Sequence, residues 1–324
     1  MMPGNKVLGI DTSNYTTSLA LYGDGEVAQK KKLLPVKPGE LGLRQSDAVF
    51  HHTQQLPALM EDLMGEASGA VEAIGVSVRP RDQEGSYMPC FTVGASAGRI
   101  LASALHIPLF SFSHQAGHIG AALYSAGRLS WLKEETPFLA FHVSGGTTEA
   151  LWVAPRKGKL HVEPAARSLD LKGGQAVDRV GGMLGLPFPA GRYMEELALR
   201  SDARFSIKPS MKGADCSLSG VENQCAALIR KGTPKEDVAL FCLLSVEAAL
   251  RAMGEALLQE RPGSPMLFAG GVMSNSILQR DLKEHFGASF AEPAFSADNA
   301  AGVAVLAALA AESSSEGESV CRLP

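Results

Sequence analysis

Two apolar segments, each interrupted by a small polar turn, are the clearest feature of the chain. Residues 7–22 and residues 138–153 each contain an apolar run, a turn rich in Ser, Thr or Gly, and a second apolar run. They align without gaps at a spacing of 131 residues, which brings Ser13 opposite Ser144. The pattern predicts a strand, a tight turn and a second strand in both places. A repeat at this spacing indicates two domains of related architecture.

Helical and strand patterns alternate along the rest of the chain. The expected helices are residues 53–64, 94–106, 233–260 (with a capping box at its start), 274–286 (ended by Gly287), one carrying His114 and His118, and a last helix capped by Ser296; the expected strands are residues 73–78, 109–112 and 266–269. This mixture predicts the α/β class. The expected domains are residues 1–130 and 131–311, followed by a disordered, Ser-rich tail at 312–324.

Composition narrows the class of protein. Of the 324 residues, 45% are hydrophobic and 20% are charged, as in an ordinary globular protein with real cores. The formal net charge is −4 and the isoelectric point is near 6.1, so a contact with RNA would need a local basic patch or a basic partner.

Cysteine usage and the apolar runs predict a cytoplasmic protein. The five cysteines form no Cys-x-x-Cys pair, which disfavours a disulfide framework or a zinc ribbon. The longest apolar run, residues 300–311, is too short for a bilayer span, so no membrane contact is expected. We also expect no signal peptide, because the chain runs directly into the first strand.

The two predicted turns are candidates for phosphate binding. Residues 13–17 and 144–148 are rich in Ser, Thr and Gly, which offer convergent backbone N–H groups and hydroxyls. Each turn alone is as well explained as a simple β-turn, but two matched turns favour phosphate contacts from both domains. The chain has no Gly-x-x-x-x-Gly-Lys-Ser/Thr motif, so it is not a P-loop protein.

A strand that runs into two glycines suggests a second ligand contact. Residues 266–269 are followed by Gly270-Gly271 and then by Asn275 near a helix start. Glycines allow a flat ring or a ribose to approach the backbone, and Asn275 offers a hydrogen bond to a base or sugar. Close packing of the strand on the helix would give the same sequence.

His114-Gln-Ala-Gly-His118 is the main candidate for metal binding. Side chains at i and i+4 lie on one face of a helix, one turn apart, as two ligands of a single ion require. Gln115 and Ala116 leave the motif without the glutamate of the zinc peptidases, so peptidase chemistry is disfavoured. The best third ligand is Asp298, at the start of the last helix; the alternative is a pair of histidines satisfied by solvent or by a carbonyl group.

The remaining polar features carry less information. His51 and His52 are expected in a solvated loop or at a helix start. The three lysines at 30–32 are expected at a solvated strand end, with a contact to RNA as the alternative. The cysteines are expected to be core thiols. No Ser-His-Asp arrangement can be argued from the sequence.

The order of these motifs resembles one family over roughly residues 7–310. The motifs are Ile10-Asp11-Thr12-Ser13, His114-Gln-Ala-Gly-His118, Val143-Ser-Gly-Gly-Thr147, Pro189-Ala-Gly191, Ser217-Leu-Ser-Gly220, Gly270-Gly-Val-Met-Ser-Asn275 and Asp298-Asn-Ala300. Together they resemble the TsaD (Gcp) family, once called O-sialoglycoprotein endopeptidases. The first turn departs from the family at Asn14 and Tyr15, where the family carries acidic residues, and so do Ala116 and Gln175.

The resemblance implies a fold and a set of ligands. The fold would be a duplicated actin-like ATPase (ASKHA, ribonuclease-H-like) fold with a cleft between the domains. One iron or zinc ion would be held by His114, His118 and Asp298. Contacts to ATP, ADP or threonylcarbamoyl-adenylate would fall on Val143, Ser144, Gly145, Gly146, Thr147, Asp178, Gly191 and Asn275.

The resemblance also implies a reaction. The family transfers a threonylcarbamoyl group from threonylcarbamoyl-adenylate to the exocyclic amine of the tRNA adenosine beside the anticodon, together with TsaB-like and TsaE-like partners. A homodimer or a heterodimer is compatible with it. The alternative is a nucleotide- and metal-binding paralogue with another substrate or a regulatory role. A sugar-kinase-like activity would need Asp11 as its catalytic carboxylate.

Overall fold

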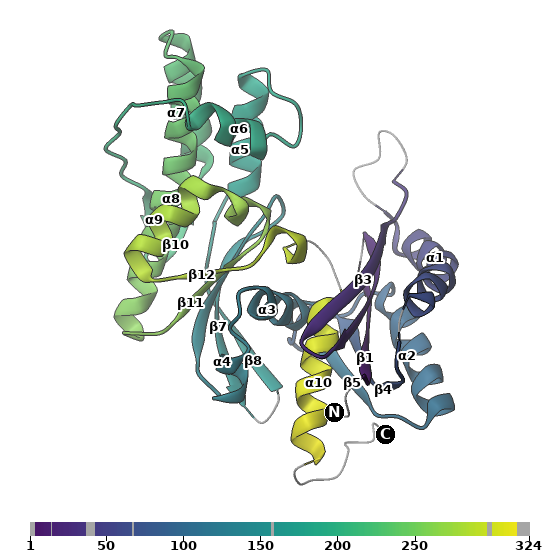
Figure 1. Cartoon of the computed structure of the whole chain (residues 1–324). Helices are drawn as coiled ribbons and strands as arrows, with labels where there is room; N and C mark the ends of the chain where they lie inside the picture. Colours follow the sequence, from purple (N-terminus) through teal and green to yellow (C-terminus); the bar gives the residue numbers. More distant parts are fainter. Residues whose placement is uncertain are drawn as a thin grey trace. The chain divides into compact units, whose positions relative to one another are not determined.

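The computed structural model describes residues 4–13, 15–36, 43–66, 68–156, 159–296 and 300–315. The chain divides into two compact units (Figure 1). Unit 1 contains Met1–Thr136, Pro155–His161 and Ala297–Pro324, and unit 2 contains Pro137–Ala154 and Val162–Ser296. Each unit is described by itself.

A five-stranded mixed sheet forms the centre of unit 1. Its order is β3-β2-β1-β4-β5, with β1 at Lys6–Ser13, β2 at Thr16–Gly23, β3 at Glu26–Leu33, β4 at Val71–Arg79 and β5 at Leu109–Ser113. β1 pairs antiparallel with β2, in the register Ser13 opposite Thr16, and parallel with β4. The first predicted hairpin is therefore confirmed.

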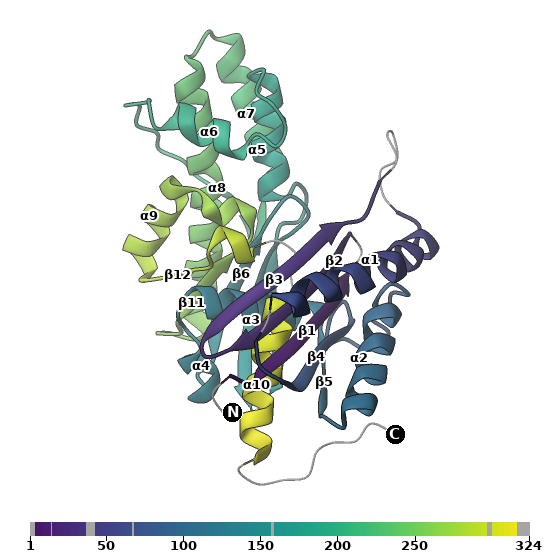
Figure 2. The same cartoon turned by 45° about the vertical axis from the view of Figure 1, so that its right-hand side comes forward.

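Helices cover both faces of the unit 1 sheet (Figure 2). They are α1 (Gln45–Gly65), α2 (Phe91–Leu105), α3 (His114–Ser125) and α10 (Ala301–Ser315). A short helix, α4 (Ser130–Lys133), follows α3 in the sequence. Side chains alternate along β1: Leu8 and Ile10 pack in one cluster with leucines of α1, whereas Val7 packs with Ala307 and Ala308 of α10. This alternation follows from the two-residue period of a strand.

Glycines let α10 lie directly on the strands and on α3. A Cβ at Gly9 of β1 would stand 2.3 Å from the carbonyl oxygen of Ala300. A Cβ at Gly302 would stand 1.7 Å from the carbonyl oxygen of Gly117 in α3. The helix that carries both histidines is therefore held against α10 at backbone contact.

The sheet of unit 2 repeats the order found in unit 1. Its order is β12-β11-β6-β7-β8, with β6 at Phe138–Val143, β7 at Thr148–Arg156, β8 at Lys159–Arg167, β11 at Met266–Ala269 and β12 at Ser289–Phe290. β6 pairs antiparallel with β7 and parallel with β11. The second predicted hairpin is present, and the two sheets share one topology, as the internal repeat predicts.

Five helices and a small hairpin complete unit 2. They are α5 (Gly173–Met183), α6 (Gly191–Ala198), α7 (Ser219–Arg230), α8 (Lys235–Glu260) and α9 (Ser276–Phe286), with β9 (Ser210–Lys212), β10 (Asp215–Ser217) and the 3-10 turns η1 (Gly271–Ser274) and η2 (Pro293–Phe295). Phe141 and Phe268, from neighbouring strands, stack at 4.6 Å inside the core formed with these helices. The predicted strand at 266–269 is confirmed.

The last helix differs from its predicted place. The expected second domain, 131–311, contains α10, but α10 packs on the sheet and on α3 of unit 1 because its Gly and Ala residues fit against Gly9 and Gly75. The Ser296 hydroxyl donates to the carbonyl of Glu292, the residue before η2. The residues that Ser296 was predicted to cap, 297–299, lie outside the described residues. α10 continues to Ser315, and the remainder of the predicted tail lies outside the described residues.

Two other local predictions need correction. α1 begins at Gln45, eight residues before the expected start, so His51 and His52 lie within the helix. α8 begins at Lys235 after Pro234 and has no side-chain cap, because Thr233 stands outside the helix.

The described cysteines, Cys90, Cys216, Cys225 and Cys242, are buried and free, as expected of core thiols, and Cys321 lies outside the described residues. Within the described ranges, every helix is too short or too polar to cross a membrane.

Candidate functional site

The two histidines of the His-x-x-x-His motif face each other at the start of α3. β5 ends at Ser113, whose hydroxyl accepts a hydrogen bond from the Ala116 N–H and caps the helix. His114 is therefore the first helical residue, and His118 lies one turn later on the same face. Their Nε2 atoms are 3.0 Å apart, and the ring planes are inclined by 72°. Two ring nitrogens thus converge on one point.

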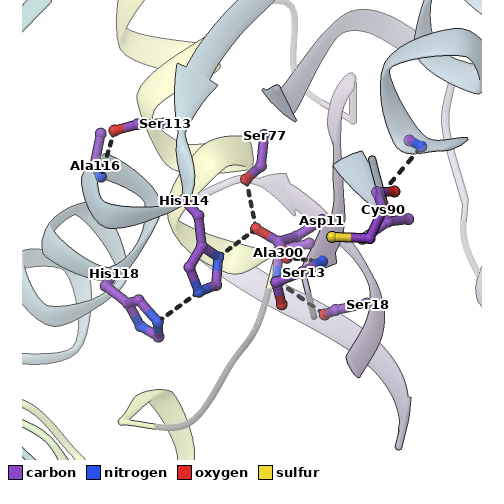
Figure 3. Close-up of polar contacts among 12 residues, drawn as sticks. Asp11, Ser13, Ser18, Ser77, Cys90, Ser113, His114, Ala116, His118 and Ala300 are labelled. Carbon is purple, nitrogen blue, oxygen red and sulfur yellow. Dashed lines mark hydrogen bonds and ion pairs between the residues drawn. The ribbon is translucent and has the colours of Figure 1, made fainter. Parts of the chain in front are cut away.

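A buried carboxylate holds one of these rings (Figure 3). Oδ2 of Asp11 lies 2.8 Å from Nδ1 of His114 and also accepts a hydrogen bond from the Ser77 hydroxyl. Oδ1 accepts the backbone N–H of Ser13 at 2.9 Å. The Asp11 side chain is only 1% exposed. The contact brings together the end of β1, the end of β4 and the start of α3.

This arrangement fits a divalent transition metal. Imidazole nitrogens are favoured ligands of zinc and iron, and a ligating histidine almost always donates its other ring N–H to a carboxylate or carbonyl group. His114 has such a partner in Asp11. Asp298, the predicted third ligand, lies outside the described residues, and the described ranges contain no group of three His, Cys, Asp or Glu side chains suited to a metal.

His52 is a buried residue that the sequence placed at the surface. Its side chain is 0% exposed, because α1 packs it beneath the first hairpin. Its Nδ1 lies 2.8 Å from the Thr17 hydroxyl, which donates to Oε1 of Gln55. Nδ1 therefore carries the proton, and Nε2 is buried without a hydrogen-bond partner among the described residues. Burial lowers the pKa of His52 below its ordinary value of 6.5.

The second hairpin turn of the repeat leaves its glycines accessible. The Ser144 N–H donates to the carbonyl of Thr147 at 2.8 Å, and the Thr147 N–H lies 3.2 Å from the Ser144 hydroxyl oxygen. These bonds close the turn from Val143 to Thr147. Gly145 and Gly146 are exposed, and nothing stands within 4 Å of the place where a Cβ would be. A ligand can therefore approach their backbone.

The N-terminus of α5 lies against this turn. The Gly174 N–H donates to the carbonyl of Ser144 at 3.1 Å, and a Cβ at Gly174 would stand 2.7 Å from Cα of Gly145. On the other side, a Cβ at Gly270 would stand 2.3 Å from the carbonyl oxygen of Val143. The turn, the start of α5 and the Gly-Gly segment thus form one cluster in unit 2.

Asp178 and Asn275 hold backbone in this unit. Oδ1 of Asp178 accepts the Ala190 N–H at 2.8 Å, which fixes the segment leading into Gly191 and α6. Oδ1 of Asn275 accepts the N–H groups of Ile277 and Leu278 at 3.1 and 3.3 Å, and so caps α9. The Asn275 side-chain oxygen thus serves the start of α9.

Three residues with buried or hydrogen-bonded side chains, Asp11, His52 and Asp170, were not identified as site residues from the sequence. From the sequence, Asp11 was considered as part of the first motif of the family and as a kinase carboxylate, and His52 as a residue of a solvated loop or a helix start. Asp170 accepts hydrogen bonds from Leu218 N–H and from the hydroxyl of Ser219, inside the Ser217–Gly220 motif. Partial burial would raise the pKa of Asp170, but these hydrogen bonds hold it below the usual value. The sequence signals for Asp11 were its place in that motif and its ionisable side chain within an apolar strand.

Comparison with known proteins places these features in context. The family model TsaD, described as tRNA N6-adenosine threonylcarbamoyltransferase, matches residues 34–305. A tRNA N6-adenosine threonylcarbamoyltransferase of Thermus thermophilus is 31% identical over 93% of this chain and 91% of that protein. One of Archaeoglobus fulgidus is 29% identical over 88% of this chain and 84% of that protein. A probable bifunctional tRNA threonylcarbamoyladenosine biosynthesis protein of Halobacterium salinarum is 28% identical over 94% of this chain, which spans 55% of it.

Solved structures agree on the architecture. Full-length HypF superposes with a TM-score of 0.58 at 13% identity, over 97% of this chain and 47% of that chain. Component A of the (R)-2-hydroxyglutaryl-CoA dehydratase of Acidaminococcus fermentans superposes with a TM-score of 0.52 at 17% identity, over 95% of this chain and 99% of that chain. These likenesses confirm the actin-like ATPase fold.

Proposed function

Because the chain belongs to the TsaD family of tRNA N6-adenosine threonylcarbamoyltransferases, we propose that it transfers a threonylcarbamoyl group to the exocyclic amine of the tRNA adenosine beside the anticodon. The observation that carries this proposal is the pair of Nε2 atoms, 3.0 Å apart at the start of α3, in a chain that matches the family over residues 34–305. Threonylcarbamoyl-adenylate is the proposed donor of the group.

A single iron or zinc ion is proposed to bind to His114, His118 and Asp298. Asp298 is two residues before Ala300 in the sequence, within the Asp298-Asn-Ala300 motif of the family. The Ala300 N–H donates to the Ser18 hydroxyl at 2.9 Å, and Ser18 is the cross-strand partner of Asp11. This anchor supports Asp298 as the third ligand. When bound, the ion would supply Lewis-acid polarisation of a carbonyl oxygen.

The adenylate part of the donor is proposed to bind in unit 2. The exposed glycines at 145 and 146 let a phosphate approach the backbone, and the start of α5 provides the positive end of a helix dipole nearby. Nδ2 of Asn275 and the backbone of Gly191 would contact the sugar or base. Asp178 would accept a ribose hydroxyl while it holds the segment before Gly191.

The proposed reaction is an acyl transfer. The adenosine amine forms a bond to the carbamoyl carbon, and the bond between that carbon and the phosphate oxygen breaks. AMP is the leaving group, and the amine loses one proton. Preorganised donors around the leaving phosphate stabilise the charge that develops on it. The chain's acidic isoelectric point, near 6.1, makes basic partners useful for holding tRNA. TsaB-like and TsaE-like proteins are the proposed partners, in the cytoplasm.

The test supplies labelled threonylcarbamoyl-adenylate and unmodified tRNA, with and without the partner proteins. Label is expected on the tRNA, and His114→Ala is expected to lower transfer by about 100-fold or more, because a lost metal removes several kcal/mol of transition-state stabilisation. His161→Ala is the control, since His161 is an exposed histidine of β8. Tight adenylate binding without transfer under every partner combination would sink the proposal.

A further inference from the structure

We propose that Asp11 is a positioning residue that fixes the tautomer of His114, so that Nε2 of that ring offers its lone pair toward Nε2 of His118. The inference rests on the proposed function, in which both histidines bind the metal. It concerns a residue outside the predicted ligand set, 103 positions away from His114 in the sequence. Its basis is the set of donors gathered around one buried carboxylate (Figure 3).

The hydrogen bonds around Asp11 fit an ionised carboxylate. The carboxyl group faces the Ser13 N–H at one oxygen, and the Ser77 hydroxyl and Nδ1 of His114 at the other. An ionised carboxylate only accepts hydrogen bonds, so it matches three donors without conflict. The backbone N–H of Ser13 can only donate a hydrogen bond, so Oδ1 of Asp11 must be its acceptor. The remaining oxygen therefore calls for Nδ1–H on His114.

The tautomer of His114 then decides what its other nitrogen does. With the proton on Nδ1, Nε2 is unprotonated and carries a lone pair. That lone pair points toward Nε2 of His118, 3.0 Å away. In the metal-free protein, His118 can donate Nε2–H across this distance; with metal, both nitrogens serve as ligands. Asp11 thus selects the ligating form of His114 before any ion arrives.

The burial of Asp11 makes this choice rigid and argues against a role as a kinase carboxylate. The side chain is 1% exposed, and the partners named above come from β1, β4 and α3. In such surroundings a hydrogen bond to a charged group is stronger than it is in water. A carboxylate engaged in this way is poorly placed to accept a proton from a substrate hydroxyl.

The first measurement uses the unaltered, metal-free protein. Nitrogen-15 NMR of labelled histidine distinguishes protonated from unprotonated ring nitrogens. We expect His114, assigned by comparison with His114→Gln, to show a protonated Nδ1 and an unprotonated Nε2 at neutral pH. The opposite tautomer would overturn the proposal. The variant only assigns the signals of His114, and the tautomer itself is measured on the unaltered protein.

The second measurement uses Asp11→Asn, which changes one oxygen to an amide nitrogen at nearly constant shape. The amide oxygen must stay on the Ser13 N–H, so the NH2 group faces His114 and forces the proton onto Nε2. We expect the affinity for Zn2+, measured by competition with a chelator, to fall about 10- to 100-fold. The NMR signature of His114 should invert in the same sample.

Two control variants separate positioning from general disruption. Asp82→Asn removes a carboxylate that accepts the Ser113 hydroxyl at 2.7 Å, at the cap of the same helix, without touching either imidazole. Ser77→Ala removes a donor to Asp11 but leaves Nδ1–H its acceptor. Both should keep the wild-type tautomer, and Asp82→Asn should keep the wild-type Zn2+ affinity.

The outcomes also separate this inference from the proposed function. If His114→Ala leaves Zn2+ binding unchanged, the metal site of the proposed function fails. If Zn2+ binding needs His114 but Asp11→Asn preserves both the affinity and the tautomer, the positioning role alone fails. Neither measurement uses tRNA, so an inactive transferase would not affect the result.

Discussion

Single buried polar side chains in unit 1 act through the partners that they hold. Asp11 gathers Ser13, Ser77 and His114, whereas His52 holds Thr17 through Nδ1. An unpaired polar atom in such a place costs about 1 to 3 kcal/mol, and Nε2 of His52 is one within the part of the chain that the structure describes. Protonation of the His52 ring would add the free-energy cost of a buried charge.

The first prediction concerns acid stability. Burial lowers the pKa of His52 in the folded protein below 6.5, whereas the unfolded chain keeps the ordinary value. Between the lowered value and pH 6.5 the unfolded state binds more protons, so stability falls as pH falls through that window and is fully present above it. His52→Asn, which preserves a donor to Thr17, should flatten this slope in urea unfolding measured from pH 7 to pH 5.

A surface histidine provides the control for this measurement. His161 is exposed on β8, so His161→Asn should keep the wild-type slope. Equal slopes in the wild type and in His52→Asn would show that His52 does not contribute to acid lability.

The sequence predicted candidate residues better than it predicted their partners. His114 and His118 are four positions apart, and helical geometry alone places them on one face. The link from His114 to Asp11 depends instead on strand and helix packing across 103 positions, which no local pattern reports. His52 was misplaced because the helix start at Gln45 lacks a side-chain cap, so the usual signal for a start was absent.

At the scale of elements, caps and close crossings position the candidate sites. Asn275 ends η1 and caps the start of α9, where its side-chain oxygen accepts the N–H of Ile277. Gly302 and Gly117 let α10 and α3 touch at the backbone. The cap of α9 needs a specific side chain, whereas the crossing of α3 and α10 needs residues without a side chain.

The second prediction tests the cap of α9. Asn275→Ala removes the acceptor for the N–H groups of Ile277 and Leu278, and should lower the free energy of unfolding by about 1 kcal/mol. Asn223→Ala is the matched control, because Asn223 lies exposed inside α7, where Ala is the better helix former. Denaturant unfolding of both variants measures the difference. Equal stabilities would contradict the capping role.

The third prediction tests the crossing of α3 and α10. A methyl group at Gly302 would stand 1.7 Å from the Gly117 carbonyl, so Gly302→Ala must separate the helices and should cost about 1 to 3 kcal/mol or more. Gly182→Ala is the control. Gly182 is exposed within α5 and a Cβ there would meet open space, so the substitution should raise the free energy of unfolding by about 0.5 to 1 kcal/mol. Thermal unfolding compares them. A neutral Gly302→Ala would show that the helices can part freely.

Whole elements were predictable where the pattern was local. Both hairpins follow from alternating apolar runs around small turns, and β11 matches residues 266–269 as predicted. The place of α10 was not predictable in this way: it follows unit 2 in sequence but packs on Gly9 and Gly75 of unit 1. Glycines read as turn or ligand signals in a sequence, and only tertiary packing shows that these two accommodate a helix.

At the scale of the molecule, one topology appears twice with different side chains at its first turn. Each sheet has its hairpin at one side and two further parallel strands at the other, in the same order. In unit 1, the strand before the turn carries the buried carboxylate of Asp11, which contacts His114. In unit 2, the turn itself exposes Gly145 and Gly146. The repeat predicted the shared architecture, whereas the contact between Asp11 and His114 in unit 1 depends on packing that the repeat does not report.

The fourth prediction follows from this division of roles. Zn2+ bound to His114 and His118 should protect α3 in unit 1 from hydrogen exchange, and an adenine nucleotide should protect the turn at 143–147 and the start of α5 in unit 2. A ligand that binds only the folded form at 100 times its Kd stabilises that form by about 2.7 kcal/mol, which slows exchange through the blocked opening about 100-fold. Exchange measured by mass spectrometry, with each ligand added separately, checks both effects. His114→Ala should abolish the protection by Zn2+ and leave the protection by nucleotide unchanged; if the variant lost both, or if Zn2+ protected only unit 2, the assignment of one ligand to each unit would be wrong.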